Sequence, residues 1–160
     1  SAVDLLKGIA VGTSMKNIYV EGANGGLDTN YEGKADAALK ALLEDGCDFV
    51  YVHVEAPDEM GHQGSIEKKI KAIEYLDQRV VARIKEGMDA SGEDYRMLVL
   101  PDHPTPICVK THTSDPVPYV LYDSRNKEEK EGVCYSEAEA GKTGKLLEKG
   151  HELIRYLLEE

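Results

Sequence analysis

The sequence predicts an α/β fold, in which a mostly parallel sheet is flanked by helices. Short β-branched and apolar runs alternate along the chain with longer segments whose apolar residues recur every three or four positions, as in amphipathic helices. Strands that alternate with helices usually pair in parallel, because each helix carries the chain back across the sheet. The 160 residues fit a single domain, residues 1–160, that is long enough to bury a core.

The first helix is predicted from about Tyr31 to Glu44. Its apolar positions have helical spacing: Ala35, Ala38, Leu39, Leu42 and Leu43. Thr29 and Glu32 form a capping-box pattern at its start, with Thr29 as the N-cap. Gly46 follows its end, where a helix-terminating glycine is common.

Two further segments have helical periodicity. One begins after Ser65, carries apolar residues at steps of three and four, and is closed by Gly87. The other covers Lys145–Glu160, whose apolar residues lie on one face and which Gly150 weakens. These two segments complete the helical part of the predicted fold.

Four short apolar runs are predicted as strands: Ile18–Val20, Phe49–Val54, Met97–Leu100 and Val117–Tyr122. The middle two are too apolar and too short for surface helices, which indicates buried strands. Turns are expected at Asn24–Gly26 and Asp89–Asp94, and a charged loop at Ser124–Gly132.

The composition limits the class of protein. A net charge of −11 argues against nucleic acid or an anionic membrane as the main partner, although a bound metal ion can still attract an anionic substrate. No apolar run reaches membrane-spanning length. The three cysteines, Cys47, Cys108 and Cys134, lack a CxxC spacing and predict reduced thiols. A soluble cytoplasmic protein is therefore expected.

Aspartates and histidines gather at the ends of the predicted strands. Asp58 and His62 follow the run Phe49–Val54, and Asp102 and His103 follow Met97–Leu100. A further histidine, His112, shortly precedes the last predicted strand. Ligands of open α/β sheets bind at the carboxyl ends of strands, and imidazole with carboxylate suits Zn²⁺, Mn²⁺ and related ions. Five such ligands are enough to begin a site for two metals.

Other interpretations of these residues stay open at this point. One zinc ion held by Asp102, His103, Cys108 and His112 would leave Asp58 and His62 unexplained. The side chains could also be loop polarity in a non-catalytic domain that serves in assembly or interaction. His53, inside a predicted strand, is expected to be a core or supporting histidine, and His151 a structural one.

The motifs VHVEAPDEMGHQG, LPDHPTP and KTHTSDPVPYVLY resemble the metal-binding half of the cofactor-independent, or 2,3-bisphosphoglycerate-independent, phosphoglycerate mutases of the archaeal-type branch. These enzymes are members of the alkaline phosphatase superfamily. The resemblance extends from SAVDLLKGIAVG through GLDTNYEGKADAAL to GHELIRYLL. It implies part of an alkaline-phosphatase-like fold, corresponding to the C-terminal portion of a longer glycolytic enzyme.

The resemblance also implies roles for the strand-end residues. Asp58, His62 and His112 resemble the ligands of one divalent metal, and Asp102 and His103 resemble ligands of a second. The family uses Mn²⁺, Mg²⁺ or Zn²⁺ and a serine that becomes phosphorylated. No motif of this chain matches that serine or the remaining aspartate ligand near the N-terminus of the family enzymes.

The function implied is the interconversion of 3-phosphoglycerate and 2-phosphoglycerate through a phosphoserine, a reaction of an isomerase. Without the serine, we expect the isolated chain to be inactive. A metal-dependent phosphatase, sulfatase or phosphodiesterase of the same superfamily is the alternative. If the chain is a portion of a larger fold, it should expose an apolar patch and self-associate.

Overall fold

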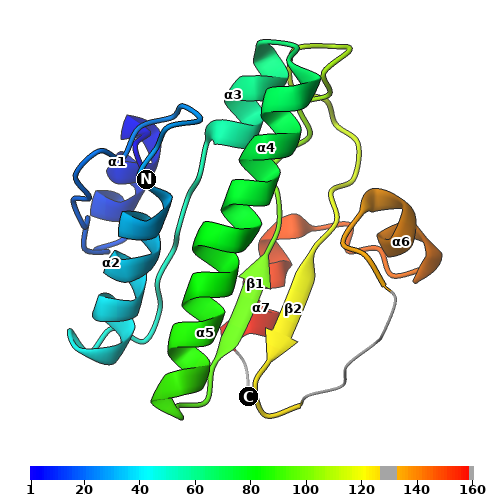
Figure 1. Cartoon of the computed structure of the whole chain (residues 1–160). Coiled ribbons are helices and arrows are strands. Elements are labelled where there is room, and N and C mark those ends of the chain that lie inside the picture. Colours follow the sequence, from blue (N-terminus) through cyan, green and yellow to red (C-terminus); the bar gives the residue numbers. More distant parts are fainter. Residues whose placement is uncertain (127–132, 159–160) are drawn as a thin grey trace. The chain divides into compact units, whose positions relative to one another are not determined.

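The computed structural model describes residues 1–126 and 133–158 (Figure 1). It divides into two compact units. The first unit comprises Ser1–Gly92 and Thr105–Thr111, and the second comprises Glu93–Pro104 and His112–Glu160. The short segment Thr105–Thr111 therefore belongs to the first unit, although in sequence it lies between the two parts of the second unit. This placement is central to the site described below.

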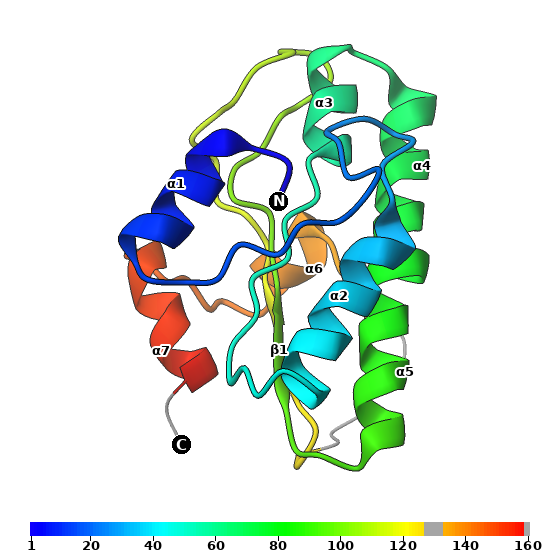
Figure 2. The ribbon, with the colours of Figure 1, turned by 90° about the vertical axis from the view of Figure 1, so that its left-hand side faces the viewer.

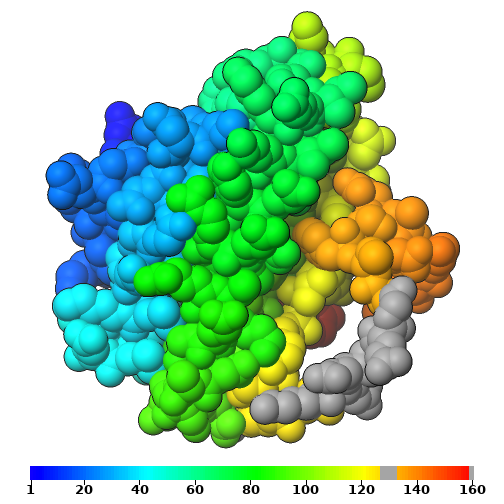
Figure 3. Space-filling model, viewed as in Figure 1, coloured from blue at the N-terminus to red at the C-terminus, as the bar shows by residue number. Residues whose placement is uncertain are grey.

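The first unit is helical in its regular structure. Its helices are α1 (Asp4–Gly12), α2 (Tyr31–Leu43), α3 (Ala56–His62), α4 (Ile66–Leu76) and α5 (Ala82–Ser91), with the π-helical turn η1 (Asp77–Val81) between the last two. Together α4, η1 and α5 form one long helix, against which α2 packs (Figures 1 and 2). In the space-filling view the side chains of α2 and of the long helix close against each other (Figure 3).

The helix predicted after Ser65 is confirmed, but its predicted end at Gly87 is wrong. The Ser65 hydroxyl caps the helix by accepting the N–H of Lys68 at 3.4 Å. The helix continues through Gly87 and ends at Gly92, which has the left-handed φ of +77° that favours glycine. A Cβ on Gly87 would lie 2.6 Å from Cδ1 of Leu39, so this glycine serves the close approach of α2.

The first predicted helix is confirmed as α2, with a different N-cap. Oδ1 of Asn30 accepts the N–H of Gly33 at 2.8 Å, so Asn30 caps the helix. Thr29 is buried and its hydroxyl oxygen accepts the N–H of Asn24 at 3.1 Å, which closes the preceding turn. Thr29, the predicted cap, does not cap the helix, because its hydroxyl oxygen already accepts a hydrogen bond within the turn.

The core of the first unit lies where α2, α3 and the long helix meet. Its fully or nearly buried members are Tyr31, Ala35, Ala56, Met60, Ala72 and Val80. Three of these six are alanines, one on each helical segment, and such small side chains let helix backbones approach closely. This packing fixes α3 against the other helices, and α3 carries two of the predicted metal ligands.

The second unit contains the sheet. Strand β1 (Arg96–Val99) pairs with β2 (Val120–Asp123), and the pairing is antiparallel with Arg96 opposite Asp123. These strands confirm two predicted runs, shifted by one and by a few residues. An ion pair at 2.9 Å between Nε of Arg96 and Oδ2 of Asp123 joins the end of the ladder.

The mostly parallel sheet expected from the sequence is not seen. Within the described residues the sheet has two strands and is antiparallel, and the runs Ile18–Val20 and Phe49–Val54 form no ladder. Their prediction as strands is wrong because an apolar run indicates burial, whereas a strand also needs a partner backbone at hydrogen-bonding distance.

The remaining helices are short. They are α6 (Glu137–Lys142), the 3₁₀ turn η2 (Gly150–Glu152) and α7 (Leu153–Leu158). The helix predicted over Lys145–Glu160 is therefore shorter than expected, and its residues 159–160 lie outside the described part, as do residues 127–132 of the predicted charged loop. Among the described residues, no helix has the length and hydrophobicity needed to cross a membrane.

Candidate metal centre

Helix α3 brings Asp58 and His62 together. The two residues are four positions apart on one helix, which places them on the same face. Oδ2 of Asp58 lies 3.3 Å from Nε2 of His62, and about a third of each side chain is exposed. Pro57 in the first turn suits the start of the helix, and the Asp58 N–H donates to the Glu55 carbonyl at 2.9 Å. The structure thus places these two candidate ligands side by side.

The second polar atom of each of these side chains, Oδ1 of Asp58 and Nδ1 of His62, contacts the segment Thr105–Thr111. The Thr105 hydroxyl donates to Oδ1 of Asp58 in a short hydrogen bond. Nδ1 of His62 lies 3.0 Å from the carbonyl oxygen of Lys110. Because a carbonyl oxygen only accepts, Nδ1 of His62 must carry a hydrogen.

These contacts determine which atoms face each other. With the hydrogen on Nδ1, a neutral His62 ring has its lone pair on Nε2, aimed at the carboxylate oxygen 3.3 Å away. Two electron-rich atoms at that distance repel, so the arrangement calls for a positive charge beside Nε2. A metal ion bound by both Asp58 and His62 would supply it. The donor set of carboxylate and imidazole fits a divalent ion.

The second unit brings together the other three predicted ligands. Asp102 and His103 follow β1, with Nε2 of His103 3.4 Å from Oδ2 of Asp102. The rings of His103 and His112 stack with centroids 3.6 Å apart, and their ligand nitrogens lie within 4.8 Å of each other. The Thr113 N–H donates to the Pro104 carbonyl at 3.1 Å, which closes the loop between the two histidines. Imidazoles this close can serve one ion or two adjacent ions.

A buried ion pair supports the start of α3. Nζ of Lys34 lies 3.1 Å from Oε2 of Glu55 and 2.9 Å from the His53 carbonyl oxygen, and the two charged side chains are 3% and 7% exposed. Nδ1 of His53 lies 3.4 Å from Oε1 of Glu55. His53 therefore has the supporting position expected from the sequence, although on an ion pair and not in a strand.

Burial alone would raise the pKa of the Glu55 carboxyl. The hydrogen bond from His53, with the charge and hydrogen bond of Lys34, outweighs burial and lowers the pKa to about 2. Glu55 is thus ionised at neutral pH. Its carbonyl accepts the N–H groups of Asp58 and Glu59, so this charge is fixed at the first turn of the helix that carries the ligands.

Thr105 and the Lys34–Glu55 pair were not predicted from the sequence. Thr105 is two residues beyond the predicted ligand His103, and a hydroxyl so close to a ligand motif was the available signal. The ion pair joins residues 21 positions apart, and no local pattern indicates such a contact.

Comparison with known protein families matches residues 1–158 to the metalloenzyme superfamily. The chain belongs to this superfamily. The match confirms the resemblance drawn from the sequence motifs, and membership of the superfamily implies dependence on divalent metal ions. The ligand pair on α3 and the stacked histidines of the second unit fit that dependence.

The chain is also similar to named 2,3-bisphosphoglycerate-independent phosphoglycerate mutases. It is 54% identical over 159 residues to the mutase of Methanosarcina acetivorans, covering 99% of this chain and 39% of that protein. It is 50% identical, with the same coverage, to the probable mutase of Geobacter sulfurreducens. The chain thus spans about two fifths of the length of these relatives.

A solved structure supports the fold. The structure of the PH0037 protein from Pyrococcus horikoshii matches with a TM-score of 0.79 and 28% identity, covering 98% of this chain and 46% of that one. An alkaline-phosphatase-like metalloenzyme fold, present in part, is thereby supported, while the parallel sheet expected for it is not seen in the described residues.

Proposed function

We propose that this chain supplies metal ligands of a phosphoglycerate mutase, an isomerase that interconverts 3-phosphoglycerate and 2-phosphoglycerate through a phosphoserine. The names of relatives up to 54% identical over 99% of the chain support the reaction. The observation that carries the proposal is the pairing of Oδ2 of Asp58 with Nε2 of His62 on α3.

In this proposal Asp58, His62 and His112 bind one divalent ion, and Asp102 and His103 bind a second, with Mn²⁺, Mg²⁺ or Zn²⁺ as the metals. The covalent chain supports the inclusion of His112, which is only two residues after Lys110, whose carbonyl holds His62. The stacking of His103 on His112 supports two adjacent ions. Bound divalent ions would lower the pKa of the attacking hydroxyl and neutralise charge on the transferred phosphoryl group.

In this reaction the residues of this chain bind the metal ions and hold the ligand side chains in the required orientation. Asp58 and His62 present one oxygen and one nitrogen to the same point, and their other polar atoms are held by protein donors and acceptors. The net charge of −11 would repel a phosphoglycerate anion, so the ions also serve to admit the substrate. We expect the reaction to take place in the cytoplasm, with neither nucleic acid nor membrane as a partner.

The isolated chain is proposed to lack mutase activity. It has no motif matching the family's nucleophilic serine, so no covalent phosphoserine can form on it. Phosphorus NMR of 3-phosphoglycerate with the purified chain and Mn²⁺ should show no 2-phosphoglycerate. Turnover that persists after contaminating enzyme has been excluded would contradict this proposal.

Self-association of the chain is proposed from its exposed apolar surface. Helix α1 has no buried residue, and Leu5, Ile9 and Val11 are 71%, 51% and 70% exposed. Sedimentation of the purified chain should show oligomers that Leu5→Glu with Ile9→Glu dissociates. A monomer at all concentrations would contradict this proposal.

Metal binding is tested by calorimetric titration of the metal-stripped chain with Mn²⁺ and with Zn²⁺. We expect one tight site, that of Asp58, His62 and His112, which is lost in His112→Ala and in His62→Ala. The second ion has only two proposed ligands in this chain, Asp102 and His103, and should bind weakly. His151→Ala is the matched control, because His151 lies in η2 and is not among the proposed ligands. A folded chain that binds neither ion would contradict the proposed metal site.

A further inference from the structure

We infer that the segment Thr105–Lys110 is a positioning clamp for the metal ligands of α3, in which Thr105 orients Asp58 and the Lys110 carbonyl orients His62. This inference rests on the proposed function for its metal, but the geometry that supports it lies wholly in the first unit. Thr105 and Lys110 are positioning residues, because each acts through a ligand.

Thr105 orients the carboxylate of Asp58. Its hydroxyl donates to Oδ1, and the Thr105 side chain is buried, with 4% of the residue exposed. A hydrogen bond from a buried hydroxyl to a carboxylate restricts the rotation of the carboxylate. Oδ2 is then the oxygen turned toward Nε2 of His62, at 3.3 Å.

The Lys110 carbonyl orients the ring of His62. It lies 3.0 Å from Nδ1 and requires a hydrogen there, which leaves the lone pair of a neutral ring on Nε2. Lys110 has a φ of +58°, a left-handed conformation that is strained for a residue with a Cβ. Its N–H donates to the Pro106 carbonyl at 2.8 Å, so a tight turn holds the carbonyl in this direction.

The clamp is itself held against α3 and α4. Nζ of Lys69 donates to the Thr105 carbonyl at 2.6 Å. A Cβ on Gly61 would lie 2.6 Å from that same oxygen, and a Cβ on Gly64 would overlap the side chain of Lys110. Two glycines and one lysine therefore allow the segment to lie directly on the helix that carries the ligands.

The consequence is a pair of ligand atoms oriented before any metal arrives. Removing a partner that orients a metal ligand typically lowers metal affinity by about 10–100-fold. Thr105→Val keeps the β-branched shape and removes the hydroxyl, whereas Thr105→Ser keeps the hydroxyl. We expect Thr105→Val to weaken Zn²⁺ binding by that factor and Thr105→Ser to stay within about threefold of wild type.

The affinities are measured by calorimetry well below the unfolding temperature of each variant, which separates affinity from stability. Binding to Co²⁺ adds a spectroscopic signature, because its visible absorption reports the geometry of the ligands. We expect an altered Co²⁺ spectrum in Thr105→Val alone. Equal affinities and equal spectra for wild type and Thr105→Val would overturn the inference.

A metal-free measurement separates failure of the clamp from failure of the proposed function. Nitrogen NMR of the His62 ring, in stripped protein above pH 8, should show the Nδ1–H tautomer of the neutral ring. If the ring is instead Nε2–H, the clamp is overturned whatever the metal result. If the tautomer is as expected and wild type binds no metal, the proposed function fails, and with it the role of the clamp in metal binding.

Discussion

Nζ of Lys34 on α2 lies 3.1 Å from Oε2 of Glu55, the residue that precedes α3, and both side chains are nearly inaccessible to solvent. The pair joins α2 to the first turn of the helix that carries Asp58 and His62. Its position makes the placement of α3 dependent on a buried electrostatic contact. Such contacts add little net stability but are costly to break on one side.

Lys34→Met is predicted to destabilise the chain by about 3–5 kcal/mol, because it leaves the Glu55 carboxylate buried without its cation. Urea unfolding followed by circular dichroism measures the loss. Lys40→Met is the matched control, since Lys40 lies on the same helix and pairs with Asp45 at the surface. A loss below 1 kcal/mol for Lys34→Met would show that the pair is not needed.

The Glu55 carboxyl should also make stability depend on pH. Its pKa is lowered from 4.5 to about 2 in the folded chain, so its stabilising contribution is complete above pH 4.5 and is lost as the pH falls toward 2. The free energy of unfolding of wild type should therefore exceed that of Glu55→Gln by an amount that shrinks between these pH values. A difference that stays constant from pH 6 to pH 2.5 would contradict the assignment.

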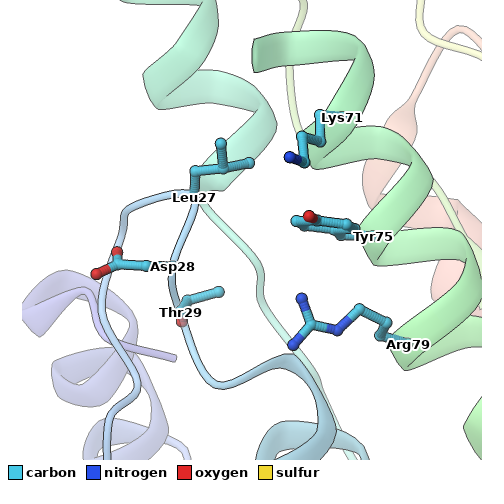
Figure 4. A pocket seen from close by; sticks show the side chains of 6 residues that line it. All are labelled: Leu27, Asp28, Thr29, Lys71, Tyr75 and Arg79. Carbon is cyan, nitrogen blue, oxygen red and sulfur yellow. The ribbon is translucent and has the colours of Figure 1, made fainter.

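Arg79 is predicted to contribute more than its neighbour Arg83. Both arginines form two-pronged ion pairs with α2, Arg79 with Glu32 at 2.5 and 2.7 Å and Arg83 with Asp36 at 2.6 and 3.0 Å. Only the Arg79 guanidinium is seen to lie over aromatic rings, 4.8 Å from the ring centroid of Tyr31 and 4.7 Å from that of Tyr75. Figure 4 shows Arg79 and Tyr75 side by side on the wall of an open pocket.

We expect Arg79→Ala to cost about 1–2 kcal/mol and Arg83→Ala to cost clearly less. The exposed ion pairs contribute little to stability in water. The cation–π contacts are lost only in Arg79→Ala, so they add to the loss of stability of that variant. Thermal and urea unfolding of both variants provide the comparison. Equal losses would mean that the contacts with the tyrosine rings do not stabilise the chain.

Gly61→Ala is predicted to weaken both metal binding and stability. The added Cβ would lie 2.6 Å from the Thr105 carbonyl oxygen and would push the clamp from α3, at a cost of about 1–3 kcal/mol. Gly8→Ala is the control, because Gly8 lies inside α1 with no atom within 4 Å of the added Cβ. It should raise stability by up to about 1 kcal/mol. If the two variants behave alike, Gly61 has no steric role.

Local patterns predicted the helices better than the sheet. Ser65 and the apolar steps after it specify the long helix, because capping and periodicity act within a few residues. Gly87 misled the prediction, since its role is to admit Leu39 from another helix. The prediction of a strand at Phe49–Val54 also failed on a contact distant in sequence, because a strand forms only where a second backbone is available to pair with it.

The candidate site was predictable at its ligands and not at their supports. Asp58 and His62 were chosen for their residue types and their position after a predicted strand. The structure places both on one face of α3, a helix that was not predicted from the sequence. The Thr105 hydroxyl reaches Asp58 from 47 positions away, and a turn at Lys110 with a strained φ brings the Lys110 carbonyl to His62. The local sequence shows a hydroxyl close to the ligand motif of Asp102 and His103, but it does not specify the contact with Asp58.

The most direct test of the account is anomalous diffraction at the zinc edge from crystals of this chain grown with Zn²⁺. We predict an anomalous peak for a zinc ion that lies about 2.0–2.2 Å from Oδ2 of Asp58 and from Nε2 of His62. In the same crystals Oδ1 should stay hydrogen-bonded to Thr105. An ordered site without a peak, or zinc bound only away from both residues, would contradict the central claim that α3 carries a metal centre.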